Sequence, residues 1–215
     1  MCRQNVNHAP SPVHNIIAAM KEAYVFLAEG FEEVEALTPV DVLRRAGIPV
    51  KTVSITSALQ VTGAHGITVT ADVLMEDTNF RGASWIILPG GLPGAENLYD
   101  CEPLRKLLEE QYASADGRIA AICASPGVVL GRMGLLKGRK ATCYPGFEKM
   151  MAGATYLDRR VVVDDKFVLG NGPSSALFWA LAIVTATLGE QAMSNVANGM
   201  LYYPNGKESL ENFFG

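Results

Sequence analysis

The sequence predicts an α/β fold in which a mainly parallel β-sheet carries helices on both faces. Three observations predict it. Short apolar runs of strand length recur along the chain, amphipathic segments of helix length separate them, and glycine or proline marks most of the boundaries. Of the 215 residues, 49% are hydrophobic, which is enough for one sizeable core. Because such sheets bind ligands beyond the carboxyl ends of their strands, we expect the functional residues in the loops at that edge.

The first β-α-β unit spans residues 23–54. Its helix ends at Gly47, and Pro39 falls in the early turns of the helical pattern. A proline there either marks the start of the helix, at Thr38–Pro39, or kinks a helix that begins earlier. The expected elements are a strand at 23–28, a turn at 29–33, a helix at 34–46 and a strand at 50–54.

The rest of the chain continues the alternation of strands and helices. Asp164-Asp165 is expected to turn a hairpin, and Ser174 or Ser175 to cap the long apolar helix that follows. A single domain is expected at 22–203, between an N-terminal tail or extension at 1–21 and a C-terminal tail at 204–215. The remaining expected elements are a hairpin at 60–62 and 67–71, strands at 84–88, 118–122, 140–142, 154–157, 161–163 and 167–170, and helices at 103–114, 174–188 and 190–200.

Composition argues against several classes of protein. The net charge of −4 leaves no basic stripe for nucleic acid, and no apolar run approaches the length that spans a membrane. The four cysteines lie far apart without a C-x-x-C pair, and there are only three histidines, so we expect no metal. Unpaired cysteines and the lack of a signal peptide predict a cytoplasmic protein.

The segment 119–127 has the pattern of a strand, a sharp turn and a helix. Four apolar residues end at Cys123, which small residues flank, and Pro126 suits the first turn of the helix. The pattern resembles the nucleophile elbow G-x-S-x-G with sulfur in place of the hydroxyl. Such a turn exposes the side chain near the N–H groups of a helix, which would lower the pKa of the thiol. The alternative is an inert buried cysteine.

Two neighbouring features supply partners for that sulfur. The Gly91 N–H, next to Gly90 at a strand end, and the amide of Ala124 would form an oxyanion hole, unless the glycine pair is only a tight turn. Glu32 and Glu33 are expected in solvent at a helix N-terminus. Glu35 lies one turn further on among apolar residues, and if it points inward its pKa is raised and it can donate a hydrogen bond to a thiolate.

Three segments, in this order and spacing, resemble the ThiJ/PfpI (DJ-one) superfamily. They are AEGFEEVEALTPVDVLRRAG at 28–47, ILPGGLPGAENL at 87–98 and AAICASPGVVL at 120–130. Each motif alone is weak, but together they are specific, and they point to the branch of the Parkinson-disease-linked protein deglycase. The resemblance implies a flavodoxin-like three-layer sandwich with a small β-hairpin, and a homodimer that needs no cofactor.

The resemblance also implies the roles of individual residues. The family's elbow cysteine corresponds to Cys123, and the buried glutamate that hydrogen-bonds to it corresponds to Glu35. Its oxyanion-binding glycine corresponds to Gly91. The turn at 171–175, which contains Pro173, resembles the segment that closes the family's pocket. Many members have a histidine where this chain has Tyr144, so a Cys–His dyad is missing and proteolysis is disfavoured. The candidate site residues are Cys123 and Glu35 for catalysis, and Gly90, Gly91, Ala124, Tyr144 and Pro173 for binding.

Two functions follow from this resemblance. In the first, Cys123 attacks a small 2-oxoaldehyde such as methylglyoxal, or its early adduct on a glycated protein, and Glu35 moves the proton in a cofactor-free glyoxalase or deglycase reaction. In the second, peroxide oxidises Cys123, and the chain acts as an oxidative-stress sensor or a redox-regulated chaperone. An amidotransferase-like hydrolase is a third possibility, which the missing histidine weakens.

Overall fold

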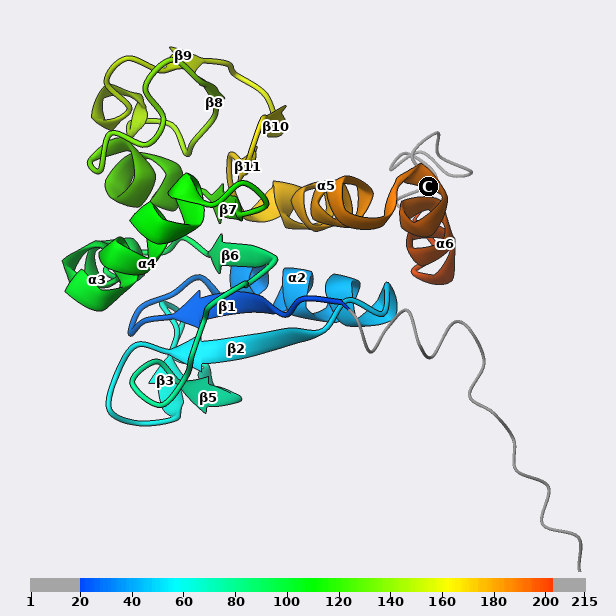
Figure 1. Cartoon of the computed structure of the whole chain (residues 1–215), viewed down its shortest axis with the longest axis horizontal. Helices are drawn as coiled ribbons and strands as arrows, with labels where there is room; N and C mark the ends of the chain where they lie inside the picture. Colours follow the sequence, from blue (N-terminus) through cyan, green and yellow to red (C-terminus); the bar gives the residue numbers. More distant parts are fainter. Residues whose placement is uncertain (1–19, 203–215) are drawn as a thin grey trace, which may run out of the picture.

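The computed structural model describes residues 20–202 and has a seven-stranded sheet at its centre (Figure 1). The strands of this sheet are β1 (Ala23–Leu27), β2 (Val50–Ser54), β5 (Val73–Leu74), β6 (Trp85–Leu88), β7 (Arg118–Ile122), β10 (Val161–Asp164) and β11 (Phe167–Gly170). Their order is β10-β11-β7-β6-β1-β2-β5, and every neighbouring pair is parallel except β10 and β11. The expected mainly parallel sheet is therefore confirmed.

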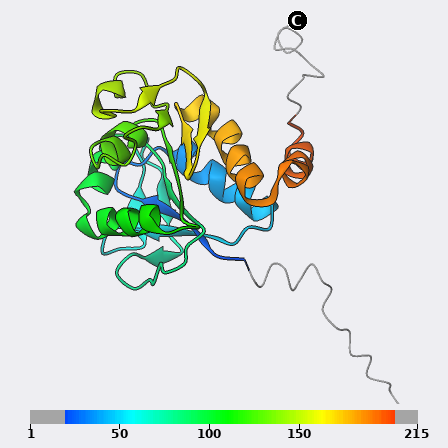
Figure 2. The same cartoon turned by 45° about the horizontal axis from the view of Figure 1, so that its top comes forward.

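Helices cover both faces of the sheet. One face packs against α2 (Glu33–Arg45) and α5 (Ala176–Leu188), and the other against α4 (Glu102–Ala113). In Figure 2 the blue α2 and the orange α5 lie together, across the sheet from the green α4. The remaining helical elements are α3 (Gly94–Asp100), α6 (Glu190–Gly199), the π-helix η1 (Pro126–Gly131) and the 3₁₀ turns η2 (Glu148–Met150) and η3 (Pro173–Ser175).

Alternation of side chains along each central strand builds two separate cores. In β1, Val25 and Leu27 face the core shared with α2 and α5, whereas Tyr24 and Phe26 face the core shared with α4. Both faces are buried, so the strands read as continuous apolar runs. This is the three-layer sandwich that the sequence predicts.

Two small sheets lie outside the central one. The expected hairpin is present as β3 (Gln60–Thr62) and β4 (Thr68–Thr70), which pair antiparallel. The short strands β8 (Lys140–Ala141) and β9 (Thr155–Tyr156) pair parallel with each other. The second expected hairpin, β10–β11, is present, but its turn is Asp165-Lys166, one residue later than predicted, because Asp164 still pairs with Phe167; Asp165 has a φ of +51°.

Helix α2 begins at Glu33, so the alternative start at Thr38–Pro39 is wrong. The Glu32 carboxylate accepts a hydrogen bond of 2.7 Å from the Glu35 N–H, which fixes the helix start at Glu33. The helix continues through Pro39, whose ring is buried. The proline removes one intrahelical hydrogen bond, and packing of the apolar face against the sheet compensates for it.

Several local predictions differ from the structure. The segment expected as loop up to the helix at 103 contains α3, and β5 was not predicted. Neither serine caps α5: Ser175 Oγ donates to Asn171 Oδ1 at 2.7 Å, and no helix amide donates to a serine hydroxyl at this helix start. A 3₁₀ turn therefore precedes the helix, which begins at Ala176.

The two predicted tails lie almost entirely outside the described residues. Within residues 20–202, no helix has both the length and the apolar character that crossing a membrane requires. Cys101, Cys123 and Cys143 are free thiols in the same range.

Candidate functional site

The turn between β7 and η1 holds Cys123 in a left-handed conformation, with a φ of +63°. Backbone of this kind costs a non-glycine residue roughly 1–2 kcal/mol. Neighbouring loops hold it on both sides: the Cys123 N–H donates to Gly170 O at 3.0 Å, and Cys123 O accepts from the Tyr144 N–H at 2.8 Å. This strained turn is the elbow that the sequence predicts, and it lies at the carboxyl edge of the sheet, where the strand arrows in Figure 1 point toward α3.

Two backbone amides face the sulfur. The N–H groups of Gly91 and Ala124 both donate to it, and both lower the pKa of the thiol. Gly91 has a φ of +89°, and a Cβ there would lie 2.5 Å from Glu32 N and from Gly30 O. Only glycine fits this position, where the loop after β6 meets the loop after β1.

Glu35 is fully buried beside the same sulfur. Its Oε2 accepts a hydrogen bond of 2.8 Å from the Gly90 N–H. A Cβ added to Gly90 would lie 2.6 Å from Cys123 Cβ and 2.7 Å from Glu35 Oε2, so the two side chains meet over a glycine that has no side chain to separate them. The other carboxyl oxygen, Oε1, is buried and has no hydrogen-bond partner among the described residues.

Burial raises the pKa of Glu35 to about 7. The nearby Glu32 carboxylate adds to the rise, while the Gly90 N–H and the adjacent Cys123 thiol oppose it. A carboxyl with this pKa carries a proton for much of the time near neutrality. The unpartnered Oε1 therefore has the means to donate a hydrogen bond to an oxygen or a sulfur anion placed next to it.

The prediction that the Cys123 thiol has a lowered pKa is wrong. Burial, followed by the negative charge of Glu35, raises this pKa to about 12, and the Gly91 and Ala124 amides oppose the rise only in part. The carboxylate contributes to the rise only while Glu35 is ionised. Protonation of Glu35 removes that repulsion and leaves the two amides facing the sulfur.

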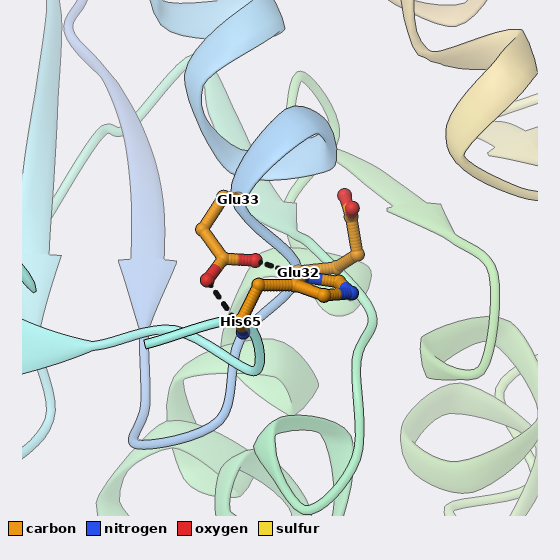
Figure 3. Close-up of side chains that lie close together, drawn as sticks. All are labelled: Glu32, Glu33 and His65. Atoms are coloured by element: carbon orange, nitrogen blue, oxygen red, sulfur yellow. Dashed lines mark hydrogen bonds and ion pairs between the residues drawn. The ribbon is translucent and has the colours of Figure 1, made fainter. Parts of the chain in front are cut away.

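The prediction that Glu32 and Glu33 lie in solvent is also wrong, because they are only 8% and 5% exposed. Figure 3 shows that Glu33 points toward His65 at the tip of the β3–β4 hairpin. Its Oε1 accepts from the His65 N–H and its Oε2 contacts His65 Nδ1, both at 2.7 Å. This contact lowers the pKa of Glu33, against the effect of burial, and raises that of His65.

Glu32, Glu33 and His65 are also a group that could hold a metal ion, because one ligand atom from each lies within 4.8 Å of the others. Three of the four carboxylate oxygens of Glu32 and Glu33 already take part in hydrogen bonds, so they are not free to bind an ion. His65 binds both oxygens of Glu33, and the α2 amide of Glu35 binds Oε2 of Glu32.

Tyr144 and Pro173 lie on two further loops at this edge. Tyr144 is 46% exposed, and its ring approaches Gly172, where an added Cβ would lie 3.3 Å from Tyr144 Cδ2. Pro173 is exposed at the start of η3. The structure thus brings together Cys123, Glu35, Gly90, Gly91 and Ala124, and places Tyr144 and Pro173 on the loops of β8 and β11 rather than at the sulfur.

Sequence reasoning missed the part that Glu32 and Glu33 play next to this site. Glutamate is not one of the residues that usually cap a helix, so the sequence held no clear signal for the role of Glu32. The ion pair with His65 had no signal either, because it depends on where the hairpin tip folds.

Comparison with known proteins agrees with this geometry. The model of the DJ-1/PfpI family matches residues 21–186. The chain belongs to the DJ-1/PfpI family. Among solved structures, "Toxoplasma gondii DJ-1, oxidized" has 37% sequence identity and a TM-score of 0.81, with 85% of this chain and 98% of that chain covered. The resemblance read from the three motifs is confirmed, and with it the flavodoxin-like sandwich.

Curated relatives of different lengths are similar to the chain. Protein DJ-1 homolog B of Arabidopsis thaliana is 40% identical over 190 residues, which cover 87% of this chain and 43% of the relative. The chain therefore spans less than half the length of that protein. The glutathione-independent glyoxalase DJR-1.2 of Caenorhabditis elegans is 35% identical over 182 residues, covering 84% of this chain and 96% of the relative.

Proposed function

We propose that the chain is a cysteine-dependent, cofactor-free glyoxalase or deglycase-type enzyme. Its substrate is a small 2-oxoaldehyde, methylglyoxal, which it converts to lactate, or the early adduct of such an aldehyde on a protein. The observation that carries the proposal is the buried Glu35 carboxyl, with one oxygen unpartnered, beside the strained Cys123. A relative of similar length bears the name of a glutathione-independent glyoxalase, which supports the same chemistry.

The proton on Glu35 decides when Cys123 reacts. With Glu35 ionised, its charge and burial hold the thiol in its protonated form. In the reactive form the proton lies on Glu35 Oε1 and the negative charge on sulfur, where the Gly91 and Ala124 amides donate to it. The pair titrates as a unit, because each group changes the charge that the other feels.

The reaction then needs one nucleophile, one proton carrier and two amides. The thiolate attacks the aldehyde carbon of methylglyoxal, and the amides stabilise the oxyanion of the resulting hemithioacetal, which then takes the proton from Glu35. The Glu35 carboxylate that remains takes the proton from the former aldehyde carbon and returns it to the former ketone carbon, while the hydroxyl proton passes to the former ketone oxygen, which yields a thioester of lactate. Water cleaves the thioester, releases lactate and restores the thiol. The net change is the addition of one water, and no electrons leave the substrate.

We further propose that the chain works as a homodimer in the cytoplasm. Val34 and Leu37 on the outer side of α2 are 52% and 40% exposed, and apolar side chains of this kind favour an interface with a second copy. We also propose that Tyr144, which is exposed and whose backbone N–H donates to Cys123 O, contacts the substrate.

The test is lactate formation from methylglyoxal by purified chain without glutathione. We expect Cys123→Ser and Glu35→Gln to lose nearly all activity. Cys143→Ser changes another buried thiol, one that lies outside the Cys123–Glu35 pair, so it is the matched control and retains activity. Equal lactate formation by the native chain and Cys123→Ser would overturn the proposal.

The second candidate function is oxidative sensing by Cys123, with redox-regulated chaperone action as its output. The solved relative described as oxidized favours it, as does the unpartnered Glu35 Oε1, which can donate to an oxygen on an oxidised sulfur. After mild peroxide, mass spectrometry should find oxygen on Cys123 and not on Cys101 or Cys143. Oxidation spread evenly over the three thiols would remove this candidate.

A further inference from the structure

A cavity lies away from Cys123, on the α4 side of the sheet. It has a volume of about 870 Å³ and is lined by α4 and by residues between 75 and 82, in the segment that connects β5 to β6. Neither Cys123 nor Glu35 lines it. Its walls combine apolar side chains, among them Ile55, Phe80 and Leu107, with polar and charged ones, among them Glu76, Lys106 and Glu110. A cavity of this size accommodates a small organic molecule with an apolar body.

Gln111 gives this cavity one defined polar contact. The residue is only 6% exposed, and its Nε2 donates to Ala83 O and to Arg118 O, both at 3.1 Å. Its Oε1 accepts no hydrogen bond from a described residue. Among the described residues, the side-chain atoms that are both fully buried and without a partner are Glu35 Oε1 and Ser84 Oγ, so Gln111 Oε1 is not fully buried. It therefore opens onto the cavity that Gln111 lines, where it can accept a hydrogen bond from a ligand.

Cys101 places a thiol in the same cavity. The residue is half-buried, and its Sγ lies 3.8 Å from the Sδ of Met75, which also lines the cavity. Thiols and thioethers are soft, polarisable groups, and an accessible thiol reacts with soft carbon electrophiles. The cavity thus combines an apolar wall, a buried acceptor for a hydroxyl or N–H donor, and a thiol.

We propose that this cavity binds 4-hydroxy-2-alkenals and that Cys101 captures them covalently. The alkyl tail lies against Phe80 and Leu107, the 4-hydroxyl donates to Gln111 Oε1, and the β-carbon of the enal faces Cys101 Sγ. These aldehydes carry an alkyl tail, a hydroxyl donor and an electrophilic carbon in one molecule, which match the apolar wall, the acceptor and the thiol of the cavity. The site is separate from the proposed oxoaldehyde chemistry at Cys123 and does not depend on it.

The capture is a conjugate addition, and it balances without a further reactant. The S–H bond breaks, and an S–C bond forms at the β-carbon of the enal. The π electrons of the carbon–carbon double bond move to the α-carbon, which takes up the thiol proton through solvent. Nothing is oxidised or reduced and no group leaves, so the protein gains the mass of one whole aldehyde.

The experiment treats the full chain with 4-hydroxynon-2-enal, non-2-enal or but-2-enal and maps the adducts by mass spectrometry after borohydride reduction. Each rate is divided by the rate of the same aldehyde with free N-acetylcysteine, which corrects for intrinsic reactivity. We expect the rate at Cys101 to saturate with 4-hydroxynon-2-enal. The corrected rate should fall several-fold from 4-hydroxynon-2-enal to non-2-enal, which lacks the hydroxyl. It should fall again, on the order of tenfold, from non-2-enal to but-2-enal, which also lacks the tail.

Two variants separate the contacts. Gln111→Leu should remove the preference for the hydroxyl and keep that for the tail. Leu107→Trp should fill the cavity and remove both, while Leu188→Trp, the same change on the exposed end of α5, should leave them intact. Leu107→Trp keeps both Gln111 hydrogen bonds, so the test stands even if Gln111→Leu does not fold. Equal corrected rates for the three aldehydes, a rate without saturation, or an unmodified Cys101 would each overturn the proposal.

Discussion

Replacing Glu35 with glutamine should make the protein more stable than the native chain at alkaline pH but not at acid pH. Glutamine has the same shape, and its amide oxygen can accept the 2.8 Å hydrogen bond from the Gly90 N–H. The change removes a carboxyl that is buried and whose pKa rises from 4.5 to about 7 on folding. The folded state therefore binds this proton more tightly than the unfolded state.

The sign and size of the effect follow from the two pKa values. Between them the native chain holds a proton that the unfolded chain has lost, so its stability falls as pH rises through this window. At 1.36 kcal/mol per pH unit, the loss between pH 5 and pH 8 is about 2–3 kcal/mol. The stability of Glu35→Gln should lack this loss, so its advantage over the native chain grows by that amount.

Urea unfolding of both proteins at a series of pH values measures the difference. The matched control is Glu109→Gln, which removes an exposed carboxyl on α4 and leaves the buried site intact. A difference between Glu35→Gln and the native chain that stays flat from pH 5 to pH 8, or that changes in the opposite direction, would refute the reasoning.

Three further predictions concern residues around Glu35 and Cys123. Gly91→Ala should cost about 2–4 kcal/mol of stability, because its Cβ would lie 2.5 Å from two backbone atoms. The control is Gly82→Ala, where φ is +80° but no atom lies within 4 Å, so it isolates the cost of φ alone. Equal losses of stability in urea unfolding would contradict this prediction. Glu32→Gln should move the pH dependence of stability to lower pH, since Glu32 helps to raise the pKa of Glu35; an unchanged midpoint would contradict it. His65→Gln should destabilise the protein most between pH 4.5 and 6.5, because folding lowers the pKa of Glu33 and raises that of His65. The stabilisation by the ion pair is lost below this window as Glu33 takes up a proton, and it declines above the window as His65 loses one. A loss of stability that does not vary with pH would argue against the ion pair.

Much of the fold could be predicted because its signals are local and strong. The apolar runs of β1, β6 and β7 are buried on both faces and read directly as strands. The elbow is equally readable, since small residues flank Cys123 and Pro126 follows it. By contrast, α3 has only seven residues, begins with glycine and has no side-chain cap, so its sequence carries little helical pattern.

The parts of the site that were predicted wrongly depend on tertiary packing. Whether a glutamate at a helix N-terminus meets solvent depends on what folds over it, and the hairpin tip at His65 covers Glu33. The pKa of Cys123 is similar: the turn supplies two amides, as expected, but burial and the Glu35 charge outweigh them. The position of η1 is likewise fixed by tertiary packing, because Gly127 and Gly131 pack against Phe147 and Met150 too closely for any side chain.

The central claim is that Cys123 is the nucleophile and that Glu35 moves the proton after it has attacked. Rapid mixing of Glu35→Gln with methylglyoxal, followed by native mass spectrometry of the intact protein and a pulse of iodoacetamide that labels the thiols left free, tests it most directly. We expect the adduct to accumulate on Cys123, with Cys143 unmodified and no lactate released. An unmodified Cys123, or lactate released by Glu35→Gln at the native rate, would contradict the account.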